Sequence, residues 1–105
     1  MQPEENIKRI IEEEVLGDNV RLAVMLYLSV RGKARFMEVA GGLGISPGRL
    51  AHHLKVLEEK GYMMIDKPWK DLRLRILTLT PEGFKALRDF LCKLKEVEES
   101  IENNE

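Results

Sequence analysis

The chain has 105 residues, of which 44% are hydrophobic and 33% are charged, and its net charge is −1. This composition describes one globular domain with a single core, and the lone Cys92 excludes an internal disulfide and indicates a reducing, cytoplasmic setting. The most apolar run, residues 22–28, is shorter than the roughly 20 residues that span a bilayer. The acidic start of the chain does not resemble a signal peptide. We therefore expect a single domain over residues 1–105 with no membrane association.

Two helices are predicted in the first third of the chain. The first, over residues 1–16, has apolar side chains at helical spacing before Gly17: Ile7, Ile10, Ile11 and Val15. The second begins at an N-cap, either Asp18 or Asn19, and ends near Gly32. Because it is apolar nearly all round, it should be the central buried helix.

A helix-turn-helix is predicted over residues 35–60. Its first helix has apolar residues at positions i, i+3, i+4 and i+7: Phe36, Val39, Ala40 and Leu43. Gly44 suits a left-handed turn position. Ser46 then suits an N-cap and Pro47 the first helical position of a second helix that runs to Lys60.

A β-hairpin and a final helix complete the predicted elements. Residues 62–66 and 72–80 read as strands joined by a loop at 67–71, so that the hairpin occupies 62–79. Thr80 caps the last helix, predicted over 80–101, with Pro81 at its first position. A helix-turn-helix followed directly by a hairpin is a winged helix, so the fold class is mainly α with a small β-hairpin wing (α+β).

Charge is distributed unevenly along the chain. Residues 31–75 carry ten basic and five acidic side chains, a local charge of +5, whereas residues 1–30 and 76–105 each carry −3. A local basic surface, rather than the net charge, is the electrostatic footprint of a phosphate-backbone partner.

Two segments carry a resemblance to a known family. "ISPGRLAHHLKVLEEKGYM" resembles the recognition-helix region of archaeal and bacterial winged-helix transcriptional regulators related to the MarR and ArsR groups, and "LTLTPEGFKAL" resembles the entry into their last helix. The resemblance covers about residues 19–94. It implies a homodimer that binds duplex DNA and regulates transcription, commonly as a repressor, with an effector that the sequence does not identify.

The predicted recognition helix has two different faces. At 100° per residue, Leu50, Leu54 and Leu57 point to the core, whereas His52 lies opposite them. An arginine in the first turn, Arg49, suits bidentate contact with guanine, and the N-cap region suits a phosphate. The DNA-contacting residues predicted here are Ser46, Gly48, Arg49, His52, His53 and Lys55.

The two adjacent histidines allow several interpretations. His53 lies at the edge of the apolar face, so it is either a packing residue or a DNA contact, and His52 is either a DNA contact or a solvated side chain. Neighbours on a helix point about 100° apart, which disfavours a shared zinc ion. The family's metal sensors carry paired cysteines, or histidines on the last helix, and this chain has neither. We expect no metal and no other cofactor.

The wing is expected to meet DNA through its basic side chains, along the backbone or in the minor groove. Its predicted contacts are Lys67, Trp69, Lys70, Arg73 and Arg75. Trp69 either packs under the wing or contacts the sugar-phosphate backbone.

The first and last helices carry more apolar residues than one small domain can cover. We expect them to pair across a two-fold axis in a homodimer. The predicted interface residues are Ile7, Ile10, Ile11, Phe84, Leu87, Phe90, Leu91, Leu94 and Val97.

Two other classes of function compete with DNA binding. A winged helix can act as a protein-interaction module, but such a surface favours apolar and aromatic residues over a basic face. An enzyme is disfavoured because the sequence has no phosphate-cradling glycine loop and no nucleophile with a recognisable base. Cys92 is either a redox group or, more ordinarily, a small apolar filler.

Overall fold

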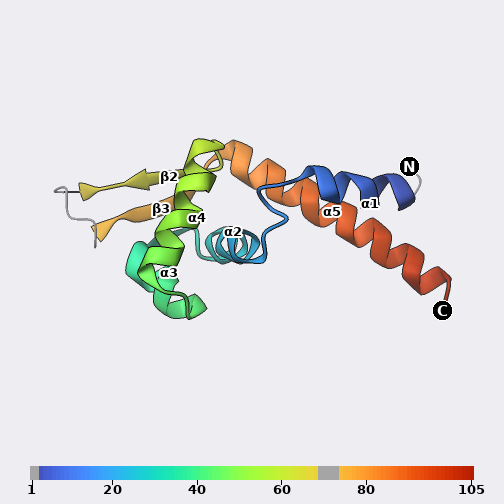
Figure 1. Cartoon of the computed structure of the whole chain (residues 1–105), viewed down its shortest axis with the longest axis horizontal. Helices are drawn as coiled ribbons and strands as arrows, with labels where there is room; N and C mark the ends of the chain where they lie inside the picture. Colours follow the sequence, from blue (N-terminus) through green and yellow to red (C-terminus); the bar gives the residue numbers. More distant parts are fainter. Residues whose placement is uncertain (1–2, 69–73) are drawn as a thin grey trace.

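The computed structural model describes residues 3–68 and 74–105 and confirms the predicted fold class. The helices are α1 (Pro3–Glu12), α2 (Asn19–Arg31), α3 (Phe36–Leu43), α4 (Pro47–Glu59) and α5 (Pro81–Asn103), and the strands are β1 (Lys33–Arg35), β2 (Met63–Asp66) and β3 (Ile76–Leu79). Figure 1 shows two parts. We call residues 18–90 the head, and α1 together with residues 91–103 of α5 the arm, which extends away from the head.

Helix α2 crosses the centre of the head, as its apolar sequence predicts. The carboxylate of Asp18 is its N-cap and accepts hydrogen bonds from the amides of Val20 (2.9 Å) and Arg21 (3.1 Å). A carboxylate at this position also favours the positive end of the helix dipole. Val24, Met25 and Leu28 of α2 are fully buried, so α2 contributes three side chains to the centre of the core.

The turn of the helix-turn-helix forms as its residue types predict. Gly44 adopts a left-handed conformation (φ 67°) between α3 and α4, which glycine tolerates without steric cost. The hydroxyl of Ser46 accepts a hydrogen bond from the Arg49 amide (3.2 Å), and Pro47 opens α4. The first turn of α4 is thereby fixed on the surface of the head.

The wing belongs to a three-stranded antiparallel sheet of order β1-β3-β2. Strand β1 was not predicted, because three residues are too few to show an alternating pattern. It pairs with β3 through Lys33 opposite Thr78 and Arg35 opposite Ile76. The second wing strand is shorter than the predicted 72–80: Leu74 and Arg75 lie outside β3.

The prediction that the first helix continues to residue 16 is wrong. Helix α1 ends at Glu12, and the chain turns so that Leu16 enters the core, where it is fully buried. The Glu13 carboxylate accepts the Leu16 amide (3.1 Å), and a Cβ on Gly17 would lie only 2.9 Å from the Glu13 carbonyl oxygen. Burial of one leucine therefore overrides the helical periodicity of this segment.

Helix α5 is anchored to the head at its first turn and then leaves it. Thr80 caps α5 by accepting the Gly83 amide (2.9 Å), and its hydroxyl donates to the Gly61 carbonyl (2.6 Å). A Cβ on Gly83 would lie 2.2 Å from the Tyr62 carbonyl oxygen, so only glycine permits this approach. The helix continues through Asn103, slightly beyond the predicted 101. No helix in residues 3–68 and 74–105 is long and apolar enough to cross a bilayer.

Candidate nucleic-acid interface

Helix α4 divides into a buried face and an exposed face. Leu50, Leu54 and Leu57 have no exposed surface, whereas Arg49 and Lys55 are exposed. The side chains of both cations make no ion pair with any described residue. Together with exposed Ser46, Gly48 and His52, they form a polar face along one side of the helix. We call these five exposed residues the reading face.

Gly48 is open rather than packed. A Cβ built on it meets no atom within 4 Å, and its φ lies outside the left-handed region. Neither the fold nor the backbone conformation therefore requires glycine at this position. Its absence of a side chain does leave the first turn of α4 accessible to a partner that approaches closely.

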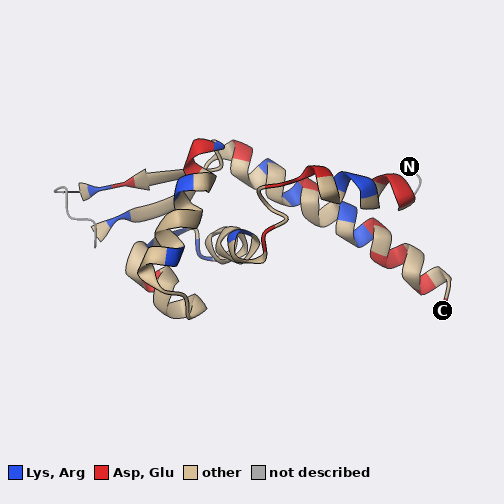
Figure 2. Ribbon diagram, in the orientation of Figure 1, with Lys and Arg blue, Asp and Glu red and all other residues tan. Residues whose placement is uncertain are grey.

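Basic residues lie on and near this face. Figure 2 shows Lys and Arg on α4 and on both wing strands, as well as on α1 and along α5, and it shows Asp and Glu on the segment after α1, at the end of α4 and toward the end of α5. Lys67, just after β2, is exposed. The head therefore presents cations on α4 and on the wing, while the last turns of α5 are mainly acidic.

The predicted wing contacts are only partly described. Arg75 is half-buried: its guanidinium lies 3.8 Å from the centroid of the Phe36 ring, and its carbonyl accepts the Phe36 amide (2.9 Å). A cation over an aromatic ring in this geometry ties the base of the wing to the start of α3. Trp69, Lys70 and Arg73 lie outside the described residues.

His53 belongs to the interior, so a DNA contact by this residue is corrected to a packing role. Its side chain is on the core side of α4 and the residue is 8% exposed. Its Nδ1 lies 3.1 Å from Nη1 of Arg21 and 3.8 Å from the Asp18 carboxylate. Burial lowers the pKa of His53, nearby Arg21 lowers it further, and Asp18 raises it; the net pKa is below its ordinary value.

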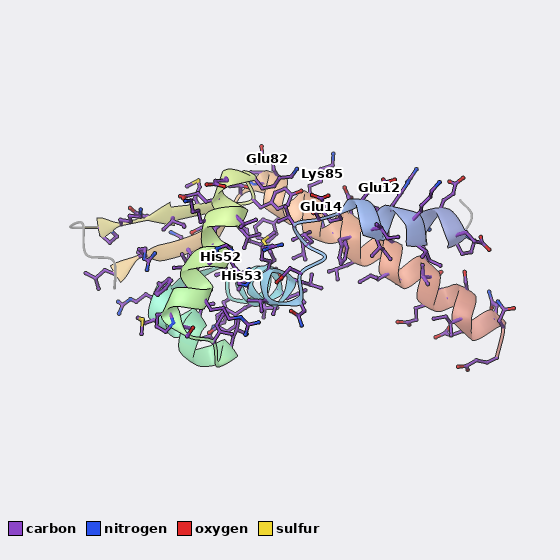
Figure 3. All side chains as sticks on the ribbon, in the orientation of Figure 1. Glu12, Glu14, His52, His53, Glu82 and Lys85 are labelled. Carbon is purple, nitrogen blue, oxygen red and sulfur yellow. The ribbon has the colours of Figure 1, made fainter. Side chains whose placement is uncertain are left out.

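His52 and His53 do not converge on one point. Their ring centroids are 5.4 Å apart with an interplanar angle of 67°, and one ring is exposed while the other is buried. Figure 3 shows both histidines on α4. Within the described residues, no group of three or more His, Cys, Asp or Glu side chains is arranged to hold a metal ion.

Arg21 is a residue that the sequence patterns did not single out. Besides His53, its guanidinium donates to the carbonyls of Val15 (2.8 Å) and Glu14 (3.3 Å), on the segment between α1 and α2. A contact between positions 21 and 53 has no periodic signature. The available signal was chemical, because a charged residue in the first turn of an otherwise apolar helix needs polar partners.

The predicted dimer residues differ in exposure. Leu87 and Phe90 are buried by the chain's own core, so these two are removed from the predicted interface. Ile10, Phe84 and Val97 are half-buried. The apolar residues left exposed on the arm are Ile7 (48%), Ile11 (77%), Leu91 (37%), Leu94 (37%) and Ile101 (56%), which continues the apolar seam of the last helix.

Comparison with known families identifies this arrangement. The profile of the winged helix DNA-binding domain family matches residues 20–97, most of the chain. The chain belongs to this family of winged-helix DNA-binding domains. No curated protein matches the chain. The reading face lies on the second helix of the helix-turn-helix, which is the helix that enters the major groove in such domains.

Solved winged-helix structures support the assignment. A transcriptional regulator homologue from Pyrococcus horikoshii OT3 is 33% identical, with a TM-score of 0.86 over 92% of this chain and 97% of that one. An ArsR-family transcriptional regulator is 29% identical, with a TM-score of 0.59 over 95% and 96% of the two chains. The protein is thus a DNA-binding regulator with MarR- and ArsR-family neighbours.

A more distant neighbour shows the fold alone. Staphylococcus aureus MarR, solved in complex with salicylate and kanamycin, is 17% identical, with a TM-score of 0.71. The match covers 78% of this chain and 55% of that protein. The shared part is therefore the winged-helix architecture, in a shorter chain.

Proposed function

We propose that the protein is a homodimeric, sequence-specific regulator of transcription that binds duplex DNA in the cytoplasm, most simply as a repressor. The observation that carries the proposal is the division of α4. Three leucines hold one face in the core, and the opposite face presents Arg49 and Lys55 without an intramolecular ion pair among the described residues. A rigid helix with a solvated basic face suits the major groove.

Each residue of the reading face has a proposed role. Arg49, in the first turn, reads guanine through two hydrogen bonds to O6 and N7. Ser46 and the first amides of α4 meet a phosphate, and Lys55, further along, meets another. His52 contacts a base edge or phosphate, and open Gly48 allows the helix to approach closely.

The wing is proposed to contribute affinity rather than specificity. Lys67 follows β2 and Arg75 precedes β3, and the sequence between them adds Trp69, Lys70 and Arg73. Cations that neutralise phosphates release counterions from the duplex, so their contribution depends on salt and hardly on sequence.

Dimerisation is supported by a continuous apolar seam on α5. Leu87 and Phe90 lie on a face of the helix that the head covers, and this face continues into Leu91, Leu94 and Ile101, which the chain leaves exposed. Ile7 of α1 lines one hollow with Val97 and Ile101, so α1 widens the seam. An exposed apolar strip of this kind is characteristic of an interface, and two copies related by a two-fold axis would cover each other's strips.

A two-fold dimer has a geometric consequence for the operator. Two α4 helices related by the axis face two half-sites of an inverted repeat, with centres about 10 bp or a multiple apart. Occupation of such a site over a promoter would exclude polymerase, which is why repression is the simplest outcome.

The proposal is tested by a binding titration at several salt concentrations. Duplexes selected by the protein from a randomised library are compared with random duplexes. We expect Arg49→Ala to lose about 1–3 kcal/mol on the selected duplex only. Lys67→Ala should weaken both duplexes alike and reduce the salt slope by about one.

Two results would count against the proposal. Equal loss on selected and random duplexes for Arg49→Ala would remove its base-reading role. Failure of the library to yield any preferred sequence would favour the protein-interaction module over a specific regulator.

A further inference from the structure

Arg21 lies where three parts of the molecule meet. Its Nη1 contacts Nδ1 of His53 on α4 (3.1 Å), while Nε and Nη2 donate to the carbonyls of Val15 (2.8 Å) and Glu14 (3.3 Å). Those carbonyls belong to the segment that joins α1 to the head, on which Figure 3 labels Glu14. One guanidinium therefore connects the helix that carries the reading face with the base of the arm.

The contact with His53 fixes the chemical form of the imidazole. Arginine has only donors, so Nδ1 of His53 must accept, and the ring is neutral with its proton on Nε2. The planar guanidinium directs its N–H groups at fixed angles, so a shift of α4 along its axis would break the contact with His53 or those with the carbonyls. A lysine can replace the charge but not this geometry.

The remaining charged neighbours of His53 act in opposite directions. The Asp18 carboxylate, 3.8 Å from Nδ1, favours a protonated ring, whereas the positive charges of Arg21 and, on α4 itself, of Arg49 disfavour it. His52 on α4 also disfavours protonation. Asp18 is occupied as well by the amides of Val20 and Arg21, which keeps it at the start of α2.

We propose that Arg21 is a positioning residue for DNA reading: through His53 it sets the placement of α4 relative to the arm, and so the spacing between the two reading faces of a dimer. The proposal rests on the proposed function, because spacing matters only if two copies read one duplex. Arg21 does not lie on the reading face, and its side chain is bonded within the chain. Its effect is on which operator spacing fits.

The first test needs no DNA. The His53 imidazole is titrated by NMR in the unmodified protein, in Arg21→Met and in Arg21→Lys, with melting temperatures recorded to show that each variant folds. Removal of the nearby positive charge should raise the pKa of His53 in Arg21→Met, and Arg21→Lys should fall between the two. An unchanged His53 titration in folded Arg21→Met would overturn the contact.

The second test measures spacing. Three duplexes are compared: the selected inverted repeat, the same repeat with one base pair added between its half-sites, and a random duplex. The added pair rotates one half-site by about 34–36° relative to the other. We expect the unmodified protein to prefer the correct spacing by at least tenfold, Arg21→Met to lose that preference while it keeps its affinity for random DNA, and Arg21→Lys to recover part of it.

The outcomes separate the two proposals. If folded Arg21→Met retains the full spacing preference, Arg21 is a structural residue only and the inference fails, while the proposed function stands. If the unmodified protein shows no preference for the selected repeat over random DNA, the proposed function fails and the positioning role fails with it. His53→Asn, whose amide oxygen can take the place of Nδ1, should retain the spacing preference if the acceptor at that position is what matters.

Discussion

The head and the arm differ in how their apolar side chains are buried. In the head, the fully buried side chains are those of Val24, Met25 and Leu28 in α2, the three leucines of the buried face of α4, and Leu77 in β3, and the exposed face of α4 is polar. In the arm, α1 lies along α5 with a part-buried polar contact, in which buried Asn6 donates to exposed Glu96 (2.5 Å), while Ile7 and Ile11 remain exposed. The head has a core of fully buried side chains, although Val30, Met64 and Met37 are exposed on its surface, whereas the arm exposes a row of apolar side chains along α1 and α5.

On the proposed function, this difference separates a DNA-reading region from a dimerisation region. A reading surface must be rigid to discriminate between bases, and a continuous core under α4 provides that rigidity. A dimerisation surface must be accessible before assembly, so its apolar residues are exposed in a single chain. Substitutions made in one region at a time test this distinction.

The largest effect is expected from a charge placed in the arm. Leu94→Glu should put a carboxylate into the seam, give monomers and weaken operator binding by roughly 10²–10⁴-fold through loss of the second head. Cys92→Glu is the matched control, since it makes the same charge change at an exposed position two residues away. Light scattering and a binding titration measure both variants; an equal loss in both would show that charge alone, not the seam, is responsible.

The next largest effect is expected when one apolar side chain in each region is truncated to alanine. Leu54→Ala removes a fully buried side chain from the head and should cost about 2–5 kcal/mol of unfolding free energy at any protein concentration. Ile11→Ala, at a 77% exposed position in the arm, should change stability only where dimers form, so its effect should depend on concentration. Denaturant unfolding at two concentrations checks this, and a concentration-independent loss for Ile11→Ala would assign that residue to the chain's own fold.

A smaller effect, of opposite sign for folding and binding, is expected at the reading face. Gly48→Ala should stabilise α4 by about 0.5–1 kcal/mol, because Ala is the better helix former and the new Cβ meets open space. The same methyl group should hinder close approach to DNA and weaken operator binding. Thermal unfolding and binding are measured on the same sample; tighter binding would show that Gly48 does not face the duplex.

The smallest effect is expected from pH. The pKa of His53 is lowered in the folded protein from an ordinary value of about 6.5. The neutral ring therefore contributes stability that is present above about pH 6.5 and lost as pH falls through the lowered pKa. The Asp18 carboxylate raises the pKa of His53, which makes this loss of stability smaller. Melting curves between pH 8 and pH 5 should show the decrease in the unmodified protein and less of it in His53→Asn; identical curves would remove His53 from the pH dependence.

Local chemistry made much of this structure predictable. The caps at Asp18, Ser46 and Thr80 and the left-handed turn at Gly44 depend on a few adjacent residues, and the structure has each of them where the sequence indicates. The same holds for the exposed and buried faces of α4, because a helix of known start has a known periodicity.

The remaining features depend on contacts between distant segments. Strand β1 exists because Lys33–Arg35 pairs with β3, and α1 stops early because Leu16 is needed in the core. The sequence places Leu87 and Phe90 on an apolar helix face. The sequence pattern of such a face does not depend on whether the chain's own core or a partner chain covers it. The link from Arg21 to His53 joins residues 32 positions apart and has no pattern to reveal it.

The proposed pairing of two chains on DNA is tested by the stoichiometry of the complex, measured by analytical ultracentrifugation with a full inverted repeat and with a single half-site on a duplex of the same length. The division between a reading head and a pairing arm predicts two chains on the full repeat, bound with high affinity, and a much weaker complex on the half-site. A monomer in free solution at micromolar concentration that binds the half-site with full affinity would contradict it.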